Sequence, residues 1–493
     1  MSFFHFMTGH LNRFESRFNY IGAGEVTSMN LSRFHKRLIV AITLSASFLS
    51  VLTQFLLITA FPKIMQEFGV DSTDVQWLTT VYMLTIAVFI PITAYFIDRF
   101  KTRHLMMSAM FLFLIGTLIC LVAPTFPMLL VGRIFQGMGS GIMIPLMQTI
   151  LFLMYPREKR GYAMGLAGLV INVAPAVGPP ISGVLVNYFD WRALFLLTLP
   201  IAALILLLAF LYMRNVTEQR ETEIDPLSIL LSTGGFGGVL YAFNKIEESG
   251  IGDPAALVSM MAGFVALGLF VYRQLRLQAP ILEIRVLKVP LFALVAFISI
   301  LSFSLLISTE TILPMYVQNA QQYSAFFGGL IVMPGALTLA AMSLFAGNLF
   351  DKYGGKIIAI TGFVLLSLST IGFHFILGLE TPFIVTMVLF MFAMGGVGLI
   401  NMPIMTAGIN SLPDNLIPHG TAVINTARQF GGSLGLTFII SFISGAEGAT
   451  ETINPAEYLV GVKTAFFVAF LFAITGLLLS LFLEKDKQPA KDR

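Results

Sequence analysis

Long apolar runs alternate with short polar connections along nearly the whole chain. Fourteen runs approach the length of roughly 20 residues that a helix needs to cross a hydrocarbon core about 30 Å thick. The pattern therefore predicts an all-α integral membrane protein. The predicted membrane helices are 37–60, 76–98, 104–123, 127–154, 161–187, 192–213, 226–246, 255–273, 290–318, 324–349, 356–378, 382–409, 419–443 and 460–483.

The composition excludes a soluble protein. The 493 residues are 57% hydrophobic and 11% charged, with a mean hydropathy of +0.86, whereas soluble proteins carry roughly a quarter charged residues. The single cysteine, Cys120, excludes an internal disulfide or a cysteine-cluster metal site. No His, Cys and carboxylate cluster has metal-ligand spacing, so neither a metal nor another cofactor is expected.

Basic residues are distributed unequally between the two sets of connections. One side of the predicted membrane holds 23 of the 29 Lys and Arg residues, and two more lie inside apolar runs. The other side has only Lys63, Arg192, Lys245 and Lys463. By the positive-inside rule, both termini are expected in the cytoplasm, with tails at 1–36 and 484–493, and the chain in the cell membrane. The net charge of +3 thus reflects membrane orientation, and nucleic acid is not an expected partner.

A charged turn occurs twice at corresponding places. "GNLFDKYGGK" at 347–356 and "AYFIDRFKTRH" at 94–104 each place an acid at a helix end, Asp351 and Asp98. The bases that follow these acids are Arg99, Arg103, Lys352 and Lys356. An acid followed by bases is suited to bridging neighbouring helix ends, so these loops are predicted to close the cytoplasmic side of a transporter. Alternatively, they are ordinary interfacial charges.

Arg133 and Arg428 lie inside apolar runs. A guanidinium inside a membrane helix is costly and is expected to face the bundle interior or an aqueous cavity. There, Arg133 would attract the deprotonated form of a nearby acid. Alternatively, Arg133 extends to the exterior surface, since its run begins near Pro127. Arg428, near the start of run 419–443, is expected to be an interfacial anchor.

Four motifs along the chain resemble those of the major facilitator superfamily. They are the loop "GNLFDKYGGK", the helix-4 motif "LLVGRIFQGMGSGIMIP", the helix-5 antiporter motif "APAVGPPISGVL" and "HGTAVINTARQFGGSLG" at 419–435. The last resembles the fourteen-helix drug:proton antiporters, the group that contains exporters of quaternary ammonium compounds and lincomycin. The first loop copy departs from the pattern, because Ala94 and Lys101 replace glycines.

The resemblance implies a major facilitator fold. Two six-helix bundles, 37–213 and 290–483, would enclose a substrate site near the midplane, with inserted helices in 214–289. Small residues allow helices to approach closely in lipid, and a proline pair should bend the fifth helix. The residues of the antiporter motif in that helix are Gly178, Pro179 and Gly183. Simple helix packing is the alternative explanation for the glycines.

One acid of the drug antiporters is missing from this chain. Their first helix usually carries an aspartate before an Asn-Val-Ala-Leu-Pro stretch, whereas "LTQFLLITAFP" has Thr53 at that place. The only deep carboxylate that remains in the sequence is Glu310, in "LLISTETILPMY". Glu310 is therefore predicted, with Arg133, to couple protons to substrate. Alternatively, it lies in water at the membrane face or caps an irregular stretch before Pro314.

The sequence favours a proton-driven exporter of hydrophobic, often cationic compounds. No phosphate-binding loop with a Gly-Lys-Ser/Thr end is present, so an ion gradient is the expected energy source and no enzymatic activity is expected. A dedicated exporter of an endogenous metabolite or lipid-like molecule is the alternative within transport. A membrane sensor or scaffold is the alternative of another class. The expected partners are small substrates, protons and lipid, and a monomer is the simplest expectation.

Overall fold

The computed structural model describes residues 32–219, 225–249, 253–444 and 454–483, and these residues contain helices but no strand. The chain divides into two units, 1–38 and 39–493, and the contacts given below all lie within the second. The long helices of the first half are α2 (Arg33–Leu56), α4 (Ser72–Arg99), α5 (Thr102–Val122), α6 (Phe126–Met154), α7 (Arg160–Tyr188) and α8 (Ala193–Tyr212). Those of the second half are α11 (Pro290–Asn319), α12 (Ala325–Tyr353), α13 (Gly355–Ile376), α14 (Phe383–Asn410), α15 (Ile417–Ser444) and α16 (Pro455–Ser480).

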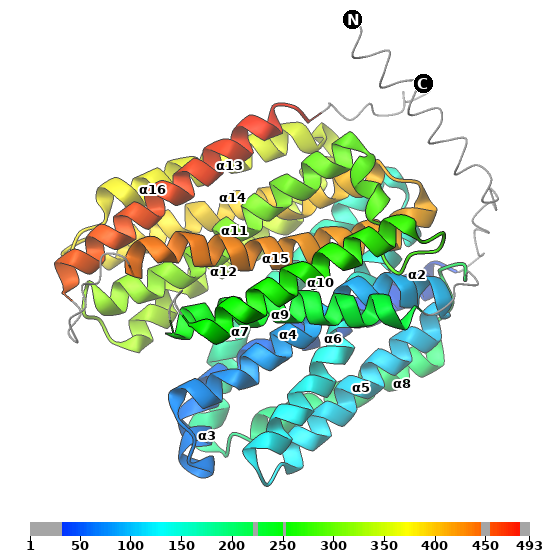
Figure 1. Cartoon of the computed structure of the whole chain (residues 1–493), viewed down its shortest axis with the longest axis horizontal. Coiled ribbons are helices and arrows are strands. Elements are labelled where there is room, and N and C mark those ends of the chain that lie inside the picture. The colour runs from blue at the N-terminus through cyan, green and yellow to red at the C-terminus, as the bar shows by residue number, and fades with distance from the viewer. Residues whose placement is uncertain (1–31, 220–224, 250–252, 445–453, 484–493) are drawn as a thin grey trace, which may run out of the picture. The chain divides into compact units, whose positions relative to one another are not determined.

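Each half packs as its own bundle. In the N-terminal bundle, α6 packs along both α4 and α5, and α8 covers α5. In the C-terminal bundle, α14 packs along α12 and α13, while α11 packs along α15 (Figure 1). The wholly buried side chains are mainly aliphatic and aromatic. This is expected where helices pack against one another and water is excluded from the interior.

Several helices begin or end at residues that favour a helix end: a capping aspartate, a proline or a glycine. Asp71 accepts a hydrogen bond from Asp74 N at 2.7 Å and so caps the start of α4. Proline, which needs no amide donor in the first turn, opens α11 and α16. Gly354 alone joins α12 to α13, and its φ of 78° is a backbone conformation that glycine tolerates.

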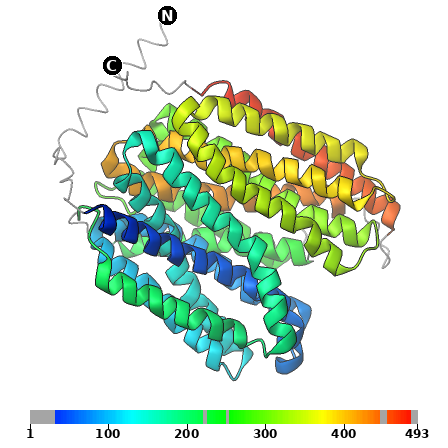
Figure 2. The same ribbon diagram turned by 180° about the vertical axis from the view of Figure 1, so that it is seen from behind.

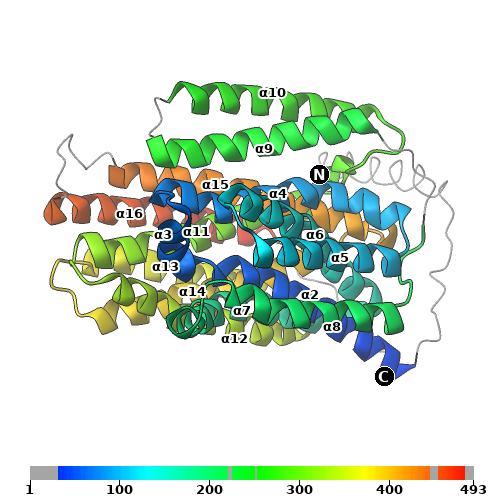
Figure 3. The ribbon, with the colours of Figure 1, turned by 90° about the horizontal axis from the view of Figure 1, so that it is seen from below.

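The inserted hairpin consists of α9 (Pro226–Ser249) and α10 (Pro254–Arg276). Figure 3 shows α10 outermost, with α9 between α10 and the helices α4 and α15 that α9 contacts. Asp225 accepts hydrogen bonds from Arg273 Nε at 2.7 Å and Nη2 at 2.9 Å. This bidentate bond lowers the pKa of Asp225 to about 2 and holds the ends of the hairpin together.

Thirteen described helices satisfy both the length and the hydropathy expected of a membrane span. The predicted fourteenth is α15, which has 28 residues but a sequence richer in glycine and polar groups. It packs against α11, α16 and α4, so its polar residues face other helices. One short helix, α3 (Phe61–Phe68), follows α2 where the sequence predicted the first span to end.

The two bundles meet mainly along two pairs of helices, with smaller contacts between α7 and α14 and between α6 and α15. The helix α7 packs along α12 (Figure 2), and α15 packs along α4. One membrane face holds the connections α4–α5, α6–α7 and α12–α13, which carry Arg99, Arg157 and Lys352; it is called the basic face below. The other is called the opposite face.

Candidate functional site

Asp351 joins the two bundles at the basic face. Its Oδ1 accepts a hydrogen bond from Gly161 N and its Oδ2 accepts one from Tyr162 N, both at 2.8 Å. Gly161 and Tyr162 belong to the first turn of α7, where amide groups lack helical partners and the helix dipole favours a negative charge. A carboxylate at the end of α12 therefore caps a helix of the other bundle.

Asp98 makes the corresponding contact from the N-terminal bundle. Its Oδ2 lies 3.0 Å from His419 Nε2 at the start of α15, and both side chains are buried. His419 Nδ1 accepts a hydrogen bond from Glu283 N at 3.1 Å. Because Nδ1 accepts, the ring hydrogen lies on Nε2, which donates to Asp98. His419 thus connects α4 to the segment between α10 and α11.

A third junction involves Arg160, which the sequence analysis did not select. Its Nη1 donates to Asn410 Oδ1 and its Nη2 donates to Asp414 Oδ1, each at 3.1 Å. Arg157 Nη2 lies 3.7 Å from the same Asp414 oxygen. The start of α7 is thereby attached to both α12 and the end of α14. Such pairs are 250 or more residues apart, and no local sequence signal relates them.

The bases of the duplicated loops behave differently from the acids. Arg103 Nη2 donates to Phe210 O at 2.5 Å, and Lys356 Nζ donates to Leu481 O at 2.5 Å. Both acceptors lie at helix ends within the same bundle as the base. Lys352 lies over the Tyr353 ring at 5.1 Å, and Arg99 is exposed. The acids therefore link the bundles, whereas Arg103 and Lys356 fasten neighbouring helix ends of their own bundle.

Asp351→Asn should slow export by at least about tenfold while leaving the amount of inserted protein near normal. The substitution removes the charge and one of two acceptors, and a hydrogen bond to a charged group contributes on the order of 1.5–3 kcal/mol. The measurement is dye export normalised to the amount of protein in the membrane. Asp74→Asn, which alters an exposed acid at the start of α4, is the control. Unchanged export by Asp351→Asn would contradict a gate role.

Glycines allow α7 and α12 to approach closely near this junction. A Cβ added at Gly165 would lie 2.8 Å from Ser343 O, and one at Gly347 would lie 2.9 Å from Gly165 Cα. In the predicted antiporter motif, a Cβ at Gly178 would lie 3.0 Å from Phe55 Cβ of α2, but one at Gly183 would meet nothing within 4 Å. Close packing therefore explains Gly178 and does not explain Gly183. The helix α7 is continuous through Pro179.

Gly347→Val should impair export more than Gly183→Val. Valine at position 347 would force α7 and α12 apart at the basic face, whereas position 183 has room for a side chain. We expect export by Gly347→Val to fall at least about fivefold, equivalent to roughly 1 kcal/mol. The measurement is again dye export per inserted molecule. Equal export by the two variants would show that this close approach is not needed.

Arg133 lies in the interior of the N-terminal bundle. Its side chain is fully buried, which excludes the alternative of an extension to the exterior surface. Nε donates to Leu78 O at 2.9 Å, and Nη1 donates to Gln136 Oε1 at 3.0 Å. The guanidinium stacks on the Tyr82 ring at 4.1 Å. Nη2 has no hydrogen-bond partner among the described residues, and no described carboxylate pairs with the guanidinium.

The position of the missing helix-1 aspartate lies beside this guanidinium. Thr53 O accepts a long hydrogen bond of 3.4 Å from Arg133 Nη1, while Thr53 Oγ1 donates to Leu49 O at 2.8 Å. The threonine hydroxyl is thus used within its own helix. An acid at position 53 would lie near Arg133, and its replacement leaves the arginine as an unneutralised charge.

Glu310 lies in α11 of the other bundle. It is nine residues before the end of α11, or about 13 Å along the axis, which places it in the half of the membrane nearer the opposite face. Its side chain is partly exposed, and no hydrogen bond or ion pair to it is found among the described residues. The structure therefore does not join Glu310 to Arg133. It places the two residues in separate bundles.

Arg428 lies deeper in the membrane than the interfacial position predicted for it. It is eleven residues into α15, about 16 Å from the start of the helix, and only 9% of the residue is exposed. The helix start was predicted to within two residues, and Arg428 lies nine residues beyond even the predicted start at 419; the interfacial prediction failed because it ignored the packing of α15 against other helices.

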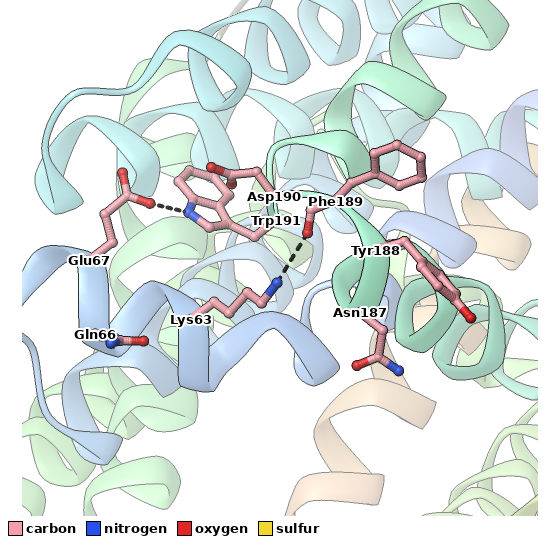
Figure 4. Close-up of a pocket in the computed structure, with 8 residues that line it drawn as sticks. All are labelled: Lys63, Gln66, Glu67, Asn187, Tyr188, Phe189, Asp190 and Trp191. Atoms are coloured by element: carbon pink, nitrogen blue, oxygen red, sulfur yellow. Dashed lines mark hydrogen bonds between the residues drawn. The ribbon is translucent and has the colours of Figure 1, made fainter.

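A cavity of about 470 Å³ lies at the opposite face, between α3 and the α7–α8 connection (Figure 4). Glu67 of α3 accepts hydrogen bonds from Trp191 Nε1 at 2.5 Å and from Arg192 Nη1 at 3.0 Å. Lys63 Nζ donates to Phe189 O at 3.1 Å. These bonds fasten α3 to the connection. None of the residues predicted to act in transport lines this cavity.

Comparison with known proteins identifies the family. The model of the Major Facilitator Superfamily matches residues 43–436. The uncharacterized MFS-type transporter YcnB of Bacillus subtilis is 45% identical over 469 residues, which cover 95% of this chain and 99% of that protein. The lincomycin resistance protein LmrB of Listeria monocytogenes is 39% identical, with coverage of 91% and 97%.

A solved structure supports the fold alone. The proton:xylose symporter XylE superposes with a TM-score of 0.64 at 13% identity, covering 92% of this chain and 97% of that one. The family model, the two relatives and the shared fold confirm the resemblance recognised from the four motifs. The chain belongs to the Major Facilitator Superfamily of membrane transporters.

Proposed function

We propose that this transporter exports hydrophobic, often cationic compounds from the cell in exchange for protons. It lies in the cell membrane with both termini in the cytoplasm, so the basic face is the cytoplasmic face. The positive-inside distribution of Lys and Arg supports this orientation. The name of the lincomycin resistance relative supports a drug-like substrate.

The observation that carries the proposal is the set of bonds between the bundles. Asp98 with His419, Asp351 with the start of α7, and Arg160 with Asp414 join the bundles at the basic face. These bonds close the cytoplasmic side, which corresponds to the state from which an exporter releases its substrate outward. All three are polar contacts at helix ends. They can break and reform as the bundles rock about the central site.

Glu310 is proposed to exchange a proton for a cationic substrate. A carboxyl group in a membrane helix without a basic partner favours its neutral form, because the charged form is costly there. A lipophilic cation entering the site favours the ionised form and releases the proton. A returning proton then displaces the cation outward. This competition couples the two flows through a single group.

The experiment is accumulation of a fluorescent cationic dye in cells with and without the protein. Cells that contain the protein should accumulate several-fold less dye, and an uncoupler that dissipates the proton gradient should abolish the difference. The signal requires normalisation to the amount of protein in the membrane. Equal accumulation with and without the protein, over several dyes, or export that persists with the uncoupler, would contradict the proposal.

A further inference from the structure

Arg428 is a mostly buried arginine whose guanidinium has no hydrogen-bond acceptor among the described residues. The described residues provide one interaction, with the Phe303 ring, whose centroid lies 4.8 Å from Arg428 Cζ. No hydrogen bond or ion pair reaches the guanidinium from any described residue. A guanidinium carries five N–H donors. An arginine that is nine-tenths buried therefore leaves its donor capacity unused.

The other two buried arginines use most of their donors within the protein, and only Arg133 Nη2 and Arg160 Nε lack a partner among the described residues. Arg133 donates to two backbone carbonyls and to Gln136, and Arg160 donates to Asn410 and Asp414. Leaving a buried charge without hydrogen-bond partners is strongly unfavourable, and buried charges are normally paired. Arg428 thus differs from Arg133 and Arg160, whose guanidinium groups are held by acceptors within the protein.

The position of Arg428 is central. It lies nine residues beyond His419, about 13 Å further into the membrane along α15. One turn closer to the basic face, Asn425 Nδ2 donates to Gln148 Oε1 of the N-terminal bundle at 2.5 Å. Arg428 therefore lies just beyond a bond that joins the bundles, on the side facing away from the closed gate.

The surroundings of Arg428 combine charge with an aromatic surface. Phe303 is partly exposed and belongs to α11, the helix that also carries Glu310. Glu310 is seven residues further along α11, which is two turns or about 10 Å, so it does not neutralise Arg428. A positive group beside an aromatic ring suits a ligand that joins an anionic group to an apolar or aromatic body.

We propose that Arg428 binds the carboxylate of a transported amphipathic compound where α15 meets the N-terminal bundle. The inference rests on the proposed function, because it places the compound in the transport site. It extends the substrate class from hydrophobic cations to compounds that carry a carboxylate. Arg428 donates hydrogen bonds to the carboxylate oxygens, and Phe303 contacts the apolar body.

The test is equilibrium binding of two xanthene dyes that differ only in whether a carboxylate is free or methyl-esterified. The purified full-length protein is placed in nanodiscs of phosphatidylcholine, and binding is followed by fluorescence anisotropy. The wild type should bind the free carboxylate about tenfold more tightly than the ester, since charged hydrogen bonds contribute at this level. Arg428→Gln should remove that preference and leave ester binding within about twofold of the wild type.

Two further variants show whether the effect of Arg428→Gln is specific to the guanidinium at this position. Arg276→Gln is the matched control, because Arg276 also lies over an aromatic ring, that of Tyr272 at 5.1 Å, but is exposed on α10. It should leave the preference unchanged. Arg428→Lys keeps the charge but not the planar fork of donors, so it should retain part of the preference. If Arg428→Gln fails to fold, a reduced preference in Arg428→Lys supports the proposal and an unchanged preference overturns it.

Other outcomes would also overturn the proposal. These are a wild type that binds neither dye or shows no preference, or an Arg428→Gln variant that changes both affinities equally. Loss of the preference when phosphatidylglycerol is added would assign the site to an anionic lipid headgroup instead. Dye binding needs no proton gradient. The preference for the free carboxylate over the ester can therefore be present in a protein that does not export. That result would reject the proposed function and retain the carboxylate site.

Discussion

Arg133→Ala should reduce gradient-driven export to less than about a tenth of the wild-type rate. The substitution removes a buried guanidinium that donates to Leu78 O, Thr53 O and Gln136 Oε1, and the loss of even one such bond corresponds to about tenfold. It also removes the fixed positive charge beside position 53. The measurement is dye export per inserted molecule in energised cells.

Arg133→Lys and Gln136→Leu separate charge from packing at this position. Lysine keeps the charge and should retain part of the export, although it cannot reproduce the planar set of donors over Tyr82. Gln136→Leu keeps the arginine and removes one of its acceptors. If charge is required, Gln136→Leu should be less impaired than Arg133→Ala. Full export by Arg133→Ala would show that Arg133 contributes to packing only and is not needed for transport.

Glu310→Gln should abolish proton-driven export of a monovalent cation while affecting a neutral substrate less. Glutamine has nearly the same shape but cannot ionise, so it can neither release a proton nor favour a bound cation. We expect cation export to fall at least about tenfold, as for a lost charge interaction within a membrane protein. The measurement compares the two substrates in the same cells.

The matched control for Glu310→Gln is Gln318→Glu, or the neutral change Gln318→Asn, two turns further along α11. Gln318 donates to Pro314 O at 3.2 Å near the end of the helix, where a change should affect both substrates little. Wild-type export of both substrates by Glu310→Gln would remove Glu310 from the coupling mechanism.

The positions of the helices could be predicted because each span needs a long apolar run. All fourteen predicted runs correspond to helices, with ends that differ by at most five residues, as at α16. The short helix α3 was missed, because Pro62 and Lys63 interrupt the apolar pattern and the helix is fastened by Glu67 to residues far away in sequence. The burial of polar residues along α15 likewise depends on the helices packed around it rather than on its own sequence.

The candidate site was less predictable, because its contacts join distant segments. The repeated charged turn selected Asp98 and Asp351, but their partners, His419 and the amides of Gly161 and Tyr162, are fixed by how the bundles meet. The depth of Arg428 and its lack of an acceptor depend on the packing of α15 against α11. The spacing of residues along one helix does not show which residues of another helix they contact.

The central claim is that one site exchanges substrate for protons, and counterflow in purified proteoliposomes tests it most directly. A permanently charged quaternary ammonium compound, which cannot follow a pH gradient by itself, is added outside vesicles with an acidic lumen and no ATP. The account predicts that the compound accumulates, that the lumen becomes less acidic as it enters, and that Glu310→Gln abolishes both changes. Movement of the compound without proton counterflow would contradict the account.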